Sequence, residues 1–271
     1  MKQNNSFNIC PLASGSKGNS VFVSTPETAV LVDAGLSGIE IERRLTQVGQ
    51  TPEQLSGIII THEHSDHIRG AGILSRRFNI PVYITPQTFA ACKNMGKIEL
   101  LHFFECGTPF RIDTLQVAPF SISHDATDPA GLTLSFGKNK IGIATDLGIA
   151  TGLVKEHLKN CQVLYIESNH DPEMLLNGSY PWSLKQRVKS RTGHLSNMDT
   201  RALLSEILDP ELDPDVKPAL RHVILAHLSE ENNCPEKAAI EVAKGLNGSG
   251  ISLHVAGPDC PGEMIRLSPG V

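Results

Sequence analysis

The sequence predicts an α/β protein in which two mixed β-sheets pack face to face, with helices on their outer sides. Its 271 residues are enough to bury a large core. Strand patterns come first and then alternate with helical patterns, and this order occurs twice along the chain. No Pro/Gly/Ser-rich linker separates the two halves, which divide near residue 107. We therefore expect a single domain over residues 1–271.

In the first half, short runs rich in Val, Ile, Leu or Phe and bounded by Gly, Ser or Pro predict strands. Segments with apolar residues at helical spacing predict helices. The predicted strands cover residues 7–12, 20–24, 28–33, 57–61 and 81–85, and the predicted helices cover residues 37–48, 66–78 and 87–95. Gly49 is placed to end the first helix, because glycine accepts the left-handed conformation common at that position.

The second half shows the same two kinds of pattern. The predicted strands cover residues 114–123, 132–136, 140–146, 162–168, 221–228, 251–255 and 263–267. The predicted helices cover residues 151–158, 182–191, 198–208 and 236–246. The last two strands would close the fold.

Composition excludes several classes of protein. The chain is 40% hydrophobic and 20% charged, which excludes general disorder. No apolar run approaches the ~20 residues that span a bilayer, and the polar start lacks the apolar core of a secretory signal. We therefore expect a cytoplasmic protein with no membrane partner, whose six scattered cysteines stay reduced. The net charge of −5 argues against a protein that coats nucleic acid electrostatically.

The densest group of candidate metal ligands is Thr-His-Glu-His-Ser-Asp-His at residues 61–67, directly after a predicted strand. Residues two apart in an extended segment point the same way, so His62 and His64 can bind one metal. Asp66 and His67 begin the next helix and can turn toward a second metal. A solvated polar loop is the alternative, but each of these side chains matches ligand chemistry. A zincin H-E-x-x-H helix is excluded, because the residue four after His62 is Asp66.

Four other predicted strand ends carry an Asp or a His, namely Asp33, His124, Asp146 and His227. Taken singly, the two Asp residues could be ordinary turn or cap residues, and His124 could be an exposed loop residue. His222 lies five residues before His227, an odd offset, so on one strand it faces the other way. These positions are informative only as a set.

The pattern His62-x-His64-x-Asp66-His67 after an apolar strand resembles the signature of the metallo-β-lactamase superfamily, and the resemblance covers nearly the whole chain. It implies an αββα sandwich with a two-metal site at one sheet edge. The implied ligands are His62, His64 and His124 for one metal, Asp66, His67 and His227 for the other, and Asp146 as the bridge. Asp33 resembles the supporting Asp that orients a ligand loop in this family.

These ligands are all nitrogen or oxygen, which suits zinc, manganese or iron and excludes a thiolate site. We therefore expect two divalent metal ions, Zn²⁺ or Mn²⁺. Two such ions ~3.5–4 Å apart can hold a hydroxide between them and stabilise both oxygens of an in-line displacement. His64 stands where the diiron oxygen reductases of the superfamily carry Glu, which favours hydrolysis over redox chemistry.

Two segments near the expected site could contact substrate. The loop of residues 13–20 could cradle an anion with its N–H groups and with Ser14, Ser16 and Asn19, but a plain Gly/Ser hairpin is the ordinary alternative. Asn169 and His170 follow a buried strand, whose end would face the site. His170 could equally be a residue at the start of a helix.

A third segment combines cations with a histidine. Four cations fall within residues 185–191, and among them Lys185 and Arg187 could hold phosphates. On a helix they would spread over more than half of the circumference, so a solvated face stays open as an alternative. His194 resembles the general acid of phosphodiesterase members of the superfamily, and Asp66 is the other residue expected to take part in catalysis. His194 could also be a bystander before a helix start.

These segments are similar to the YycJ/WalJ-like subfamily, and more distantly to RNase Z, RNase J and PhnP. The resemblance implies a metal-dependent phosphodiesterase or nuclease, with 5′-to-3′ exonuclease action on DNA preferred over RNA. A glyoxalase II-like thioesterase or lactonase is one alternative, although the about 44 residues after His227 are too few for the helical domain such enzymes usually add. A regulatory protein with a vestigial metal site is another. Two divalent ions would change the net charge from −5 to about −1, which suits local capture of a phosphate chain end.

Overall fold

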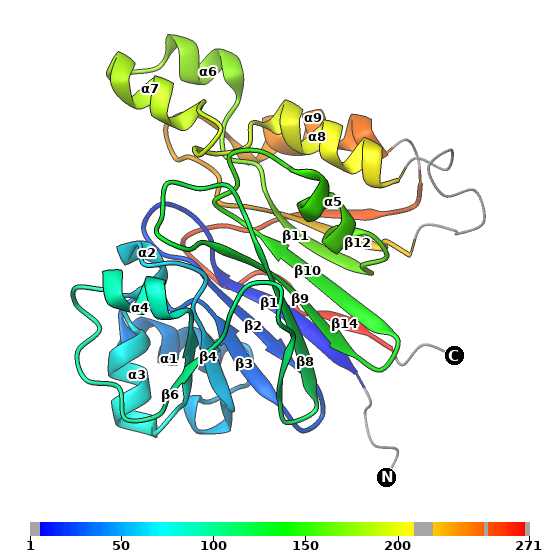
Figure 1. Cartoon of the computed structure of the whole chain (residues 1–271). Helices are drawn as coiled ribbons and strands as arrows, with labels where there is room; N and C mark the ends of the chain where they lie inside the picture. Colours follow the sequence, from blue (N-terminus) through cyan, green and yellow to red (C-terminus); the bar gives the residue numbers. More distant parts are fainter. Residues whose placement is uncertain (1–5, 209–218, 247–248, 269–271) are drawn as a thin grey trace.

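The computed structural model describes residues 6–208, 219–246 and 249–268. Within these ranges, two seven-stranded β-sheets pack face to face, and helices cover the outer side of each sheet (Figure 1). The architecture predicted from the sequence is thereby confirmed.

The first sheet has the strand order β14-β1-β2-β3-β4-β5-β6. Its strands are β1 (Phe7–Ala13), β2 (Ser20–Ser24), β3 (Ala29–Val32), β4 (Gly57–Ile59), β5 (Val82–Ile84), β6 (Leu101–Phe103) and β14 (Ile265–Leu267). Strands from β14 to β3 pair antiparallel, and those from β3 to β6 pair parallel. Its outer helices are α1 (Gly38–Gln47), α2 (Ser65–Ile68), α3 (Ala71–Phe78) and α4 (Pro86–Ala91), with a 3₁₀ turn at Pro52–Gln54.

The second sheet has the order β13-β12-β11-β10-β9-β8-β7. Its strands are β7 (Phe110–Ile112), β8 (Leu115–Ser121), β9 (Ala130–Phe136), β10 (Asn139–Ala144), β11 (Val163–Glu167), β12 (His222–Ala226) and β13 (Ser252–Val255). The helices of this half are α5 (Gly152–Leu158), α6 (Pro172–Asn177), α7 (Trp182–Val188), α8 (Asn197–Ile207) and α9 (Pro235–Leu246). Helices α5, α8 and α9 lie over the sheet, whereas α6 and α7 project beyond its end (Figure 1).

Three features differ from the sequence prediction. The helix expected over residues 66–78 is broken into α2 and α3 at Gly70, where a Cβ would lie 2.5 Å from the carbonyl oxygen of Leu36. Strands β6 and β7 and helix α6 lie outside the predicted elements, because each is short and carries a weak pattern. The strand expected over residues 263–267 joins the first sheet beside β1, so the two halves do not separate cleanly along the chain.

Alternation along the central strands builds the core. In β3, Val30 and Val32 belong to the apolar cluster between the sheets, while Leu31 packs with the helices outside. In β11, Tyr165 faces the other sheet and Leu164 faces the helices of its own half. Because both faces are covered, these strands are apolar at nearly every position. The sheets therefore form a rigid base for the loops at their ends.

Two expectations about the environment can be compared with the described residues. None of their helices is both long and apolar enough to cross a bilayer. All six cysteines are free thiols, as the sequence indicates.

Arg44 of α1 joins the first sheet to the loop that precedes β14. Its side chain is buried, and Nη1 donates to the carbonyl oxygens of Leu12 and Pro258, each at 2.8 Å. Nε donates to Glu40 Oε1 at 2.6 Å, which neutralises the guanidinium. One buried cation thus holds three segments that are distant in sequence.

Replacing this cation should destabilise the fold. We expect Arg44→Ala to lower the free energy of unfolding by roughly 2–4 kcal/mol, because buried carbonyls lose their donor and Glu40 loses a partner. Arg43→Ala is the matched control, since Arg43 is half exposed and pairs with the same Glu40. It should cost under about 1 kcal/mol. Urea unfolding measures both, and equal losses would contradict the tie described for Arg44.

Candidate metal centre

The predicted metal ligands meet where strand ends of the two sheets approach each other. Residues 61–67 follow β4, and the three other predicted ligands follow β8, β10 and β12. Asp33, Asp146 and His227, each next to a strand end, have φ angles of 60°, 57° and 55°. Residues other than glycine rarely adopt this left-handed backbone conformation. Where they do, the strain is often found at functional sites.

His62, His64 and His124 form the first cluster. One nitrogen from each ring lies within 4.8 Å of the other two. Nε2 of His124 is 3.3 Å from Nδ1 of His64. Burial lowers the pKa of His62 and, to a lesser degree, that of His124. Both rings are therefore neutral near pH 7, and the neutral imidazole is the form that binds a metal.

Asp66, His67 and His227 form the second cluster, and Asp146 reaches both. Oδ2 of Asp66 is 3.5 Å from Nε2 of His67 and 3.7 Å from Nε2 of His227. Asp146 Oδ2 lies 3.2 Å from Nε2 of His67, while its Oδ1 lies 3.7 Å from Nε2 of His124. The structure thus brings together all seven side chains that the sequence singles out as metal ligands.

The cluster contains polar atoms that the protein itself leaves without partners. Nε2 of His62, Oδ2 of Asp146 and Nε2 of His227 are buried and make no hydrogen bond to any described residue. Buried polar atoms without partners are rare, since each costs free energy. All three are metal-ligating atoms that point into the cluster, so the residues present fit a bound cation.

The charges within the cluster favour the same conclusion. Burial opposes ionisation of Asp146, but the imidazoles of His227 and His67 outweigh it and hold the pKa of Asp146 well below its ordinary value. Burial likewise opposes protonation of His67 and His227, yet nearby carboxylates raise the pKa of both rings well above the ordinary value. Nearby carboxylates favour protonation of these rings, and a bound divalent cation could take the place of those protons.

Asp33 supports the cluster from outside. Its Oδ2 lies 2.7 Å from Nδ1 of His67 and accepts the hydroxyl of Thr61 at 2.8 Å, while its Oδ1 accepts the backbone N–H of Thr61. A proton on Nδ1 of His67 leaves Nε2 free to bind a metal. The carboxylate also fixes the start of the ligand segment. Asp33 therefore contacts one ligand side chain and the backbone that carries the others.

Glu167 orients imidazole rings on the His227 side of the cluster, as Asp33 does for His67. The sequence analysis did not identify this residue. The residue ends β11 and is fully buried. Its Oε1 lies 2.8 Å from Nδ1 of His194 and 2.9 Å from Nδ1 of His227. Burial raises its pKa, but these imidazoles outweigh burial and lower it to about 2. The sequence signal that could have identified Glu167 is a carboxylate at the end of a strand that is otherwise apolar.

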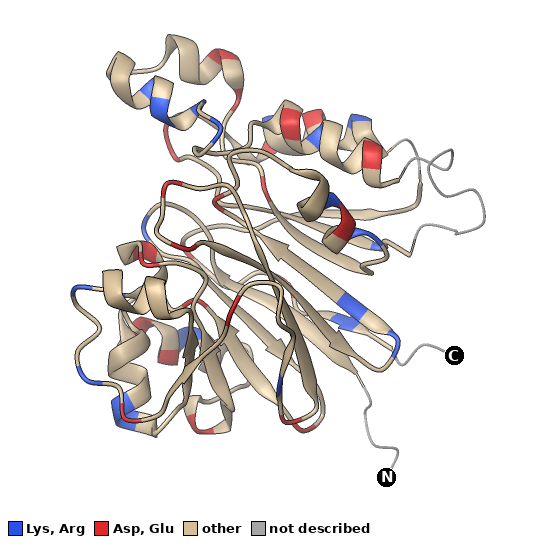
Figure 2. Ribbon diagram, viewed as in Figure 1, with Lys and Arg blue, Asp and Glu red and all other residues tan. Residues whose placement is uncertain are grey.

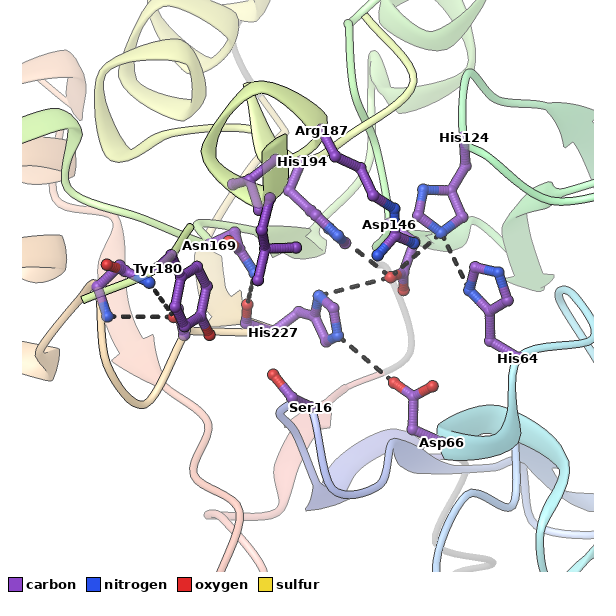
Figure 3. Close-up of a pocket in the computed structure, with 14 residues that line it drawn as sticks. Ser16, His64, Asp66, His124, Asp146, Asn169, Tyr180, Arg187, His194 and His227 are labelled. Carbon is purple, nitrogen blue, oxygen red and sulfur yellow. Dashed lines mark hydrogen bonds and ion pairs between the residues drawn. The ribbon is translucent and has the colours of Figure 1, made fainter. Parts of the chain in front are cut away.

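A pocket opens over the cluster (Figure 3). Part of its lining comes from five of the predicted metal ligands, His64, Asp66, His124, Asp146 and His227. Ser16, Asn169, Arg187 and His194, four residues expected to contact substrate or take part in catalysis, also line it. Figure 3 shows the His194 and His227 rings directed toward Asp146.

Four other candidates for substrate contact have different surroundings. Ser14 is buried and its hydroxyl accepts the N–H of His227 at 2.7 Å. Asn19 lies behind the ligands, with Nδ2 3.1 Å from both Asp66 Oδ2 and His67 Nε2. His170 is buried outside the pocket lining.

Lys185 is the fourth of these candidates. Its ammonium is engaged by the carbonyl oxygens of Leu176 and Gly178, at 2.8 and 2.7 Å. The side chain lies outside the pocket lining.

Two packed sheets with a buried histidine and aspartate cluster at their strand ends define a class of metal-binding hydrolases. The chain belongs to the metallo-beta-lactamase superfamily, whose model matches residues 13–169. The resemblance drawn from the residues 61–67 is confirmed.

Two similar proteins are named as nucleases. The chain is 36% identical to exodeoxyribonuclease YycJ of Bacillus anthracis, over 93% of this chain and 96% of that one. It is 36% identical to exodeoxyribonuclease WalJ of Streptococcus pneumoniae, over 92% of this chain and 91% of the relative. The crystal structure of YhfI from Bacillus subtilis shares the fold with a TM-score of 0.71 and 14% identity, covering 95% of this chain and 99% of that one. Superfamily membership and these relatives make the chain a hydrolase.

Removing the support from His67 should weaken metal binding. We expect Asp33→Asn to lower the affinity for Zn²⁺ by about 10- to 100-fold, because the carboxylate that orients the ring is lost. Elemental analysis after dialysis against buffered Zn²⁺ measures this. Asp113→Asn is the matched control, because Asp113 is an exposed Asp with φ 46° outside the cluster. An unchanged affinity in Asp33→Asn would contradict the role described for Asp33.

Proposed function

We propose that the protein is a metal-dependent phosphodiesterase that acts on nucleic acid as a 5′-to-3′ DNA exonuclease. The observation that carries the proposal is a cluster of seven candidate His and Asp ligands, five of which line one pocket together with His194, whose ring is held by Glu167. The similarity to exodeoxyribonucleases over nearly the whole chain supports DNA as the substrate.

The ligand set would hold two divalent ions, Zn²⁺ or Mn²⁺. His62, His64 and His124 would bind one ion, Asp66, His67 and His227 the other, and Asp146 both. When bound, such ions lower the pKa of an attacking water and neutralise charge on the phosphoryl oxygens. The oxygen and nitrogen donors suit this chemistry.

His194 is the proposed general acid. Its Nδ1 is 2.8 Å from Glu167 Oε1, so a proton on Nδ1 is held by the carboxylate and Nε2 remains for substrate. Burial lowers the pKa of His194, but Glu167 outweighs burial and raises it above the ordinary value. The raised pKa favours a second proton on the ring, which the ring can give to the leaving oxygen.

Arg187 is the proposed phosphate contact. It lines the pocket and its Nε donates to Asp125 Oδ2 at 2.5 Å, which leaves its terminal nitrogens for an anion. Figure 2 shows Lys and Arg gathered on α7 and the segment after it, in a chain of net charge −5. Among these cations Arg187 lines the pocket, so a positive charge lies there although the whole chain is acidic.

Loss of Asp146 should abolish metal-dependent cleavage. We expect Asp146→Ala to release 5′-labelled nucleotides from DNA at a rate indistinguishable from background, because both metal positions lose a ligand. Asp113→Ala serves as the control, being an exposed Asp in the same backbone conformation. Full activity of Asp146→Ala would overturn the assignment of the site. Turnover of a thioester but of neither DNA nor RNA by the wild type would overturn the nuclease proposal.

The effect of replacing His194 on the cleavage rate should depend on the leaving group. We expect His194→Ala to slow cleavage of DNA by about 10²- to 10⁴-fold, because the leaving alkoxide needs a proton. A nitrophenyl phosphodiester should be slowed much less, since nitrophenolate leaves without one. Comparison of kcat for the two substrates makes the measurement. Equal slowing of both would exclude His194 as the general acid.

A further inference from the structure

The part of the pocket away from the metal ligands has a different chemistry from the cluster. Tyr180, Leu184 and Val188 form an apolar wall, and Asn169 and Asn232 add neutral amides. The carboxylates that line the pocket, Asp66 and Asp146, both belong to the metal cluster. A phosphate would find little there to bind, whereas a flat, neutral group with hydrogen-bonding edges would fit.

The turn that carries Tyr180 is fixed on both sides. The carbonyl oxygen of Gly178 accepts the Lys185 ammonium at 2.7 Å. The hydroxyl of Ser179 donates to Glu231 Oε2 at 2.7 Å. Pro181 follows, and a residue before proline is restricted to extended backbone. Lys185 therefore acts through this turn, and the position of Tyr180 is set before any ligand arrives.

The Tyr180 side chain is itself unengaged. In the described ranges its ring makes no aromatic pair, and its hydroxyl forms no hydrogen bond. The ring is half-buried and borders the pocket (Figure 3). A half-buried ring that makes no aromatic pair and borders the pocket leaves part of its surface free for stacking.

An ion pair connects the helix after Tyr180 to the neighbourhood of the metal cluster. Arg187, on the same helix as Leu184, donates to Asp125 Oδ2 at 2.5 Å. Asp125 Oδ1 in turn lies 3.4 Å from Nε2 of the metal ligand His124. The wall, a cation and the cluster therefore line a single pocket, in which a nucleotide could place both its base and its phosphate.

We propose that Tyr180 stacks on the base of a nucleotide bonded to the scissile phosphate and so sets a requirement for a base at that position. The inference rests on the proposed nuclease function, since it names the part of the substrate that this end of the pocket receives. Aromatic stacking tolerates every base, because each has a π-face. The site would therefore select nucleic acid over other phosphodiesters without selecting sequence.

The test compares DNA with and without a base at the cleavage point. Three 5′-labelled single strands are used: one intact, one with an abasic tetrahydrofuran at the first nucleotide, and one with it at the second. For the wild type, we expect kcat/KM to fall about 5- to 100-fold for one of the two abasic strands. In Tyr180→Ala, the ratio of intact to abasic kcat/KM should fall close to one. Tyr180→Phe should restore it, because the ring remains.

The control separates stacking from a general effect of losing an aromatic ring near helices α6 and α7. Trp182→Ala removes a large aromatic ring that is 65% exposed on α7 and outside the pocket lining, so the ratio should stay at its wild-type value. A ratio unchanged in Tyr180→Ala, or lost equally in Trp182→Ala, overturns the inference, as does a Tyr180→Phe variant that behaves like Tyr180→Ala. Circular dichroism and urea midpoints verify folding of each variant. Failure of the wild type to cleave any strand counts against the proposed function instead.

Discussion

The site depends on the pairing of buried carboxylates with imidazole nitrogens that face away from the metal cluster. Asp33 lies 2.7 Å from Nδ1 of His67, and Glu167 lies within 2.9 Å of Nδ1 of both His194 and His227. Burying a carboxylate without a partner is costly, so these acids require the rings beside them. The same contacts set which ring nitrogen is left for a ligand. The same contacts therefore stabilise the strand ends and position the side chains of the site.

Backbone strain is tolerated at these strand ends because neighbouring groups hold it. Asp33, Asp146 and His227 have φ near 60°, a conformation that costs about 1–3 kcal/mol for residues of this kind. The N–H of His227 donates to the hydroxyl of Ser14, and Asp33 accepts two hydrogen bonds from Thr61. Each strained residue thus turns its side chain out of the strand direction and into the space between the sheets' ends. Regular strands would direct these side chains along the two faces.

Parts of the site formed by residues close together in the sequence could be predicted, and parts formed by residues far apart could not. His62, His64, Asp66 and His67 lie within six positions, so a local pattern was enough to find them. Glu167 was missed because its partner His194 is 27 residues away and its role exists only once β11 is in the sheet. The division of the helix at Gly70 and the return of β14 to the first sheet depend likewise on contacts between distant segments.

The acidic net charge of the chain is compatible with a polyanionic substrate, because one part of the pocket is suited to a phosphate and another part to a neutral base. The proposed metal ions and Arg187 would supply positive charge where a phosphate would lie, and the Tyr180 wall is neutral. Lys185, which the sequence placed among phosphate contacts, instead donates hydrogen bonds to the carbonyl oxygens of Leu176 and Gly178, which precede Tyr180. Affinity would then come from one phosphate and one base, not from contacts along the strand.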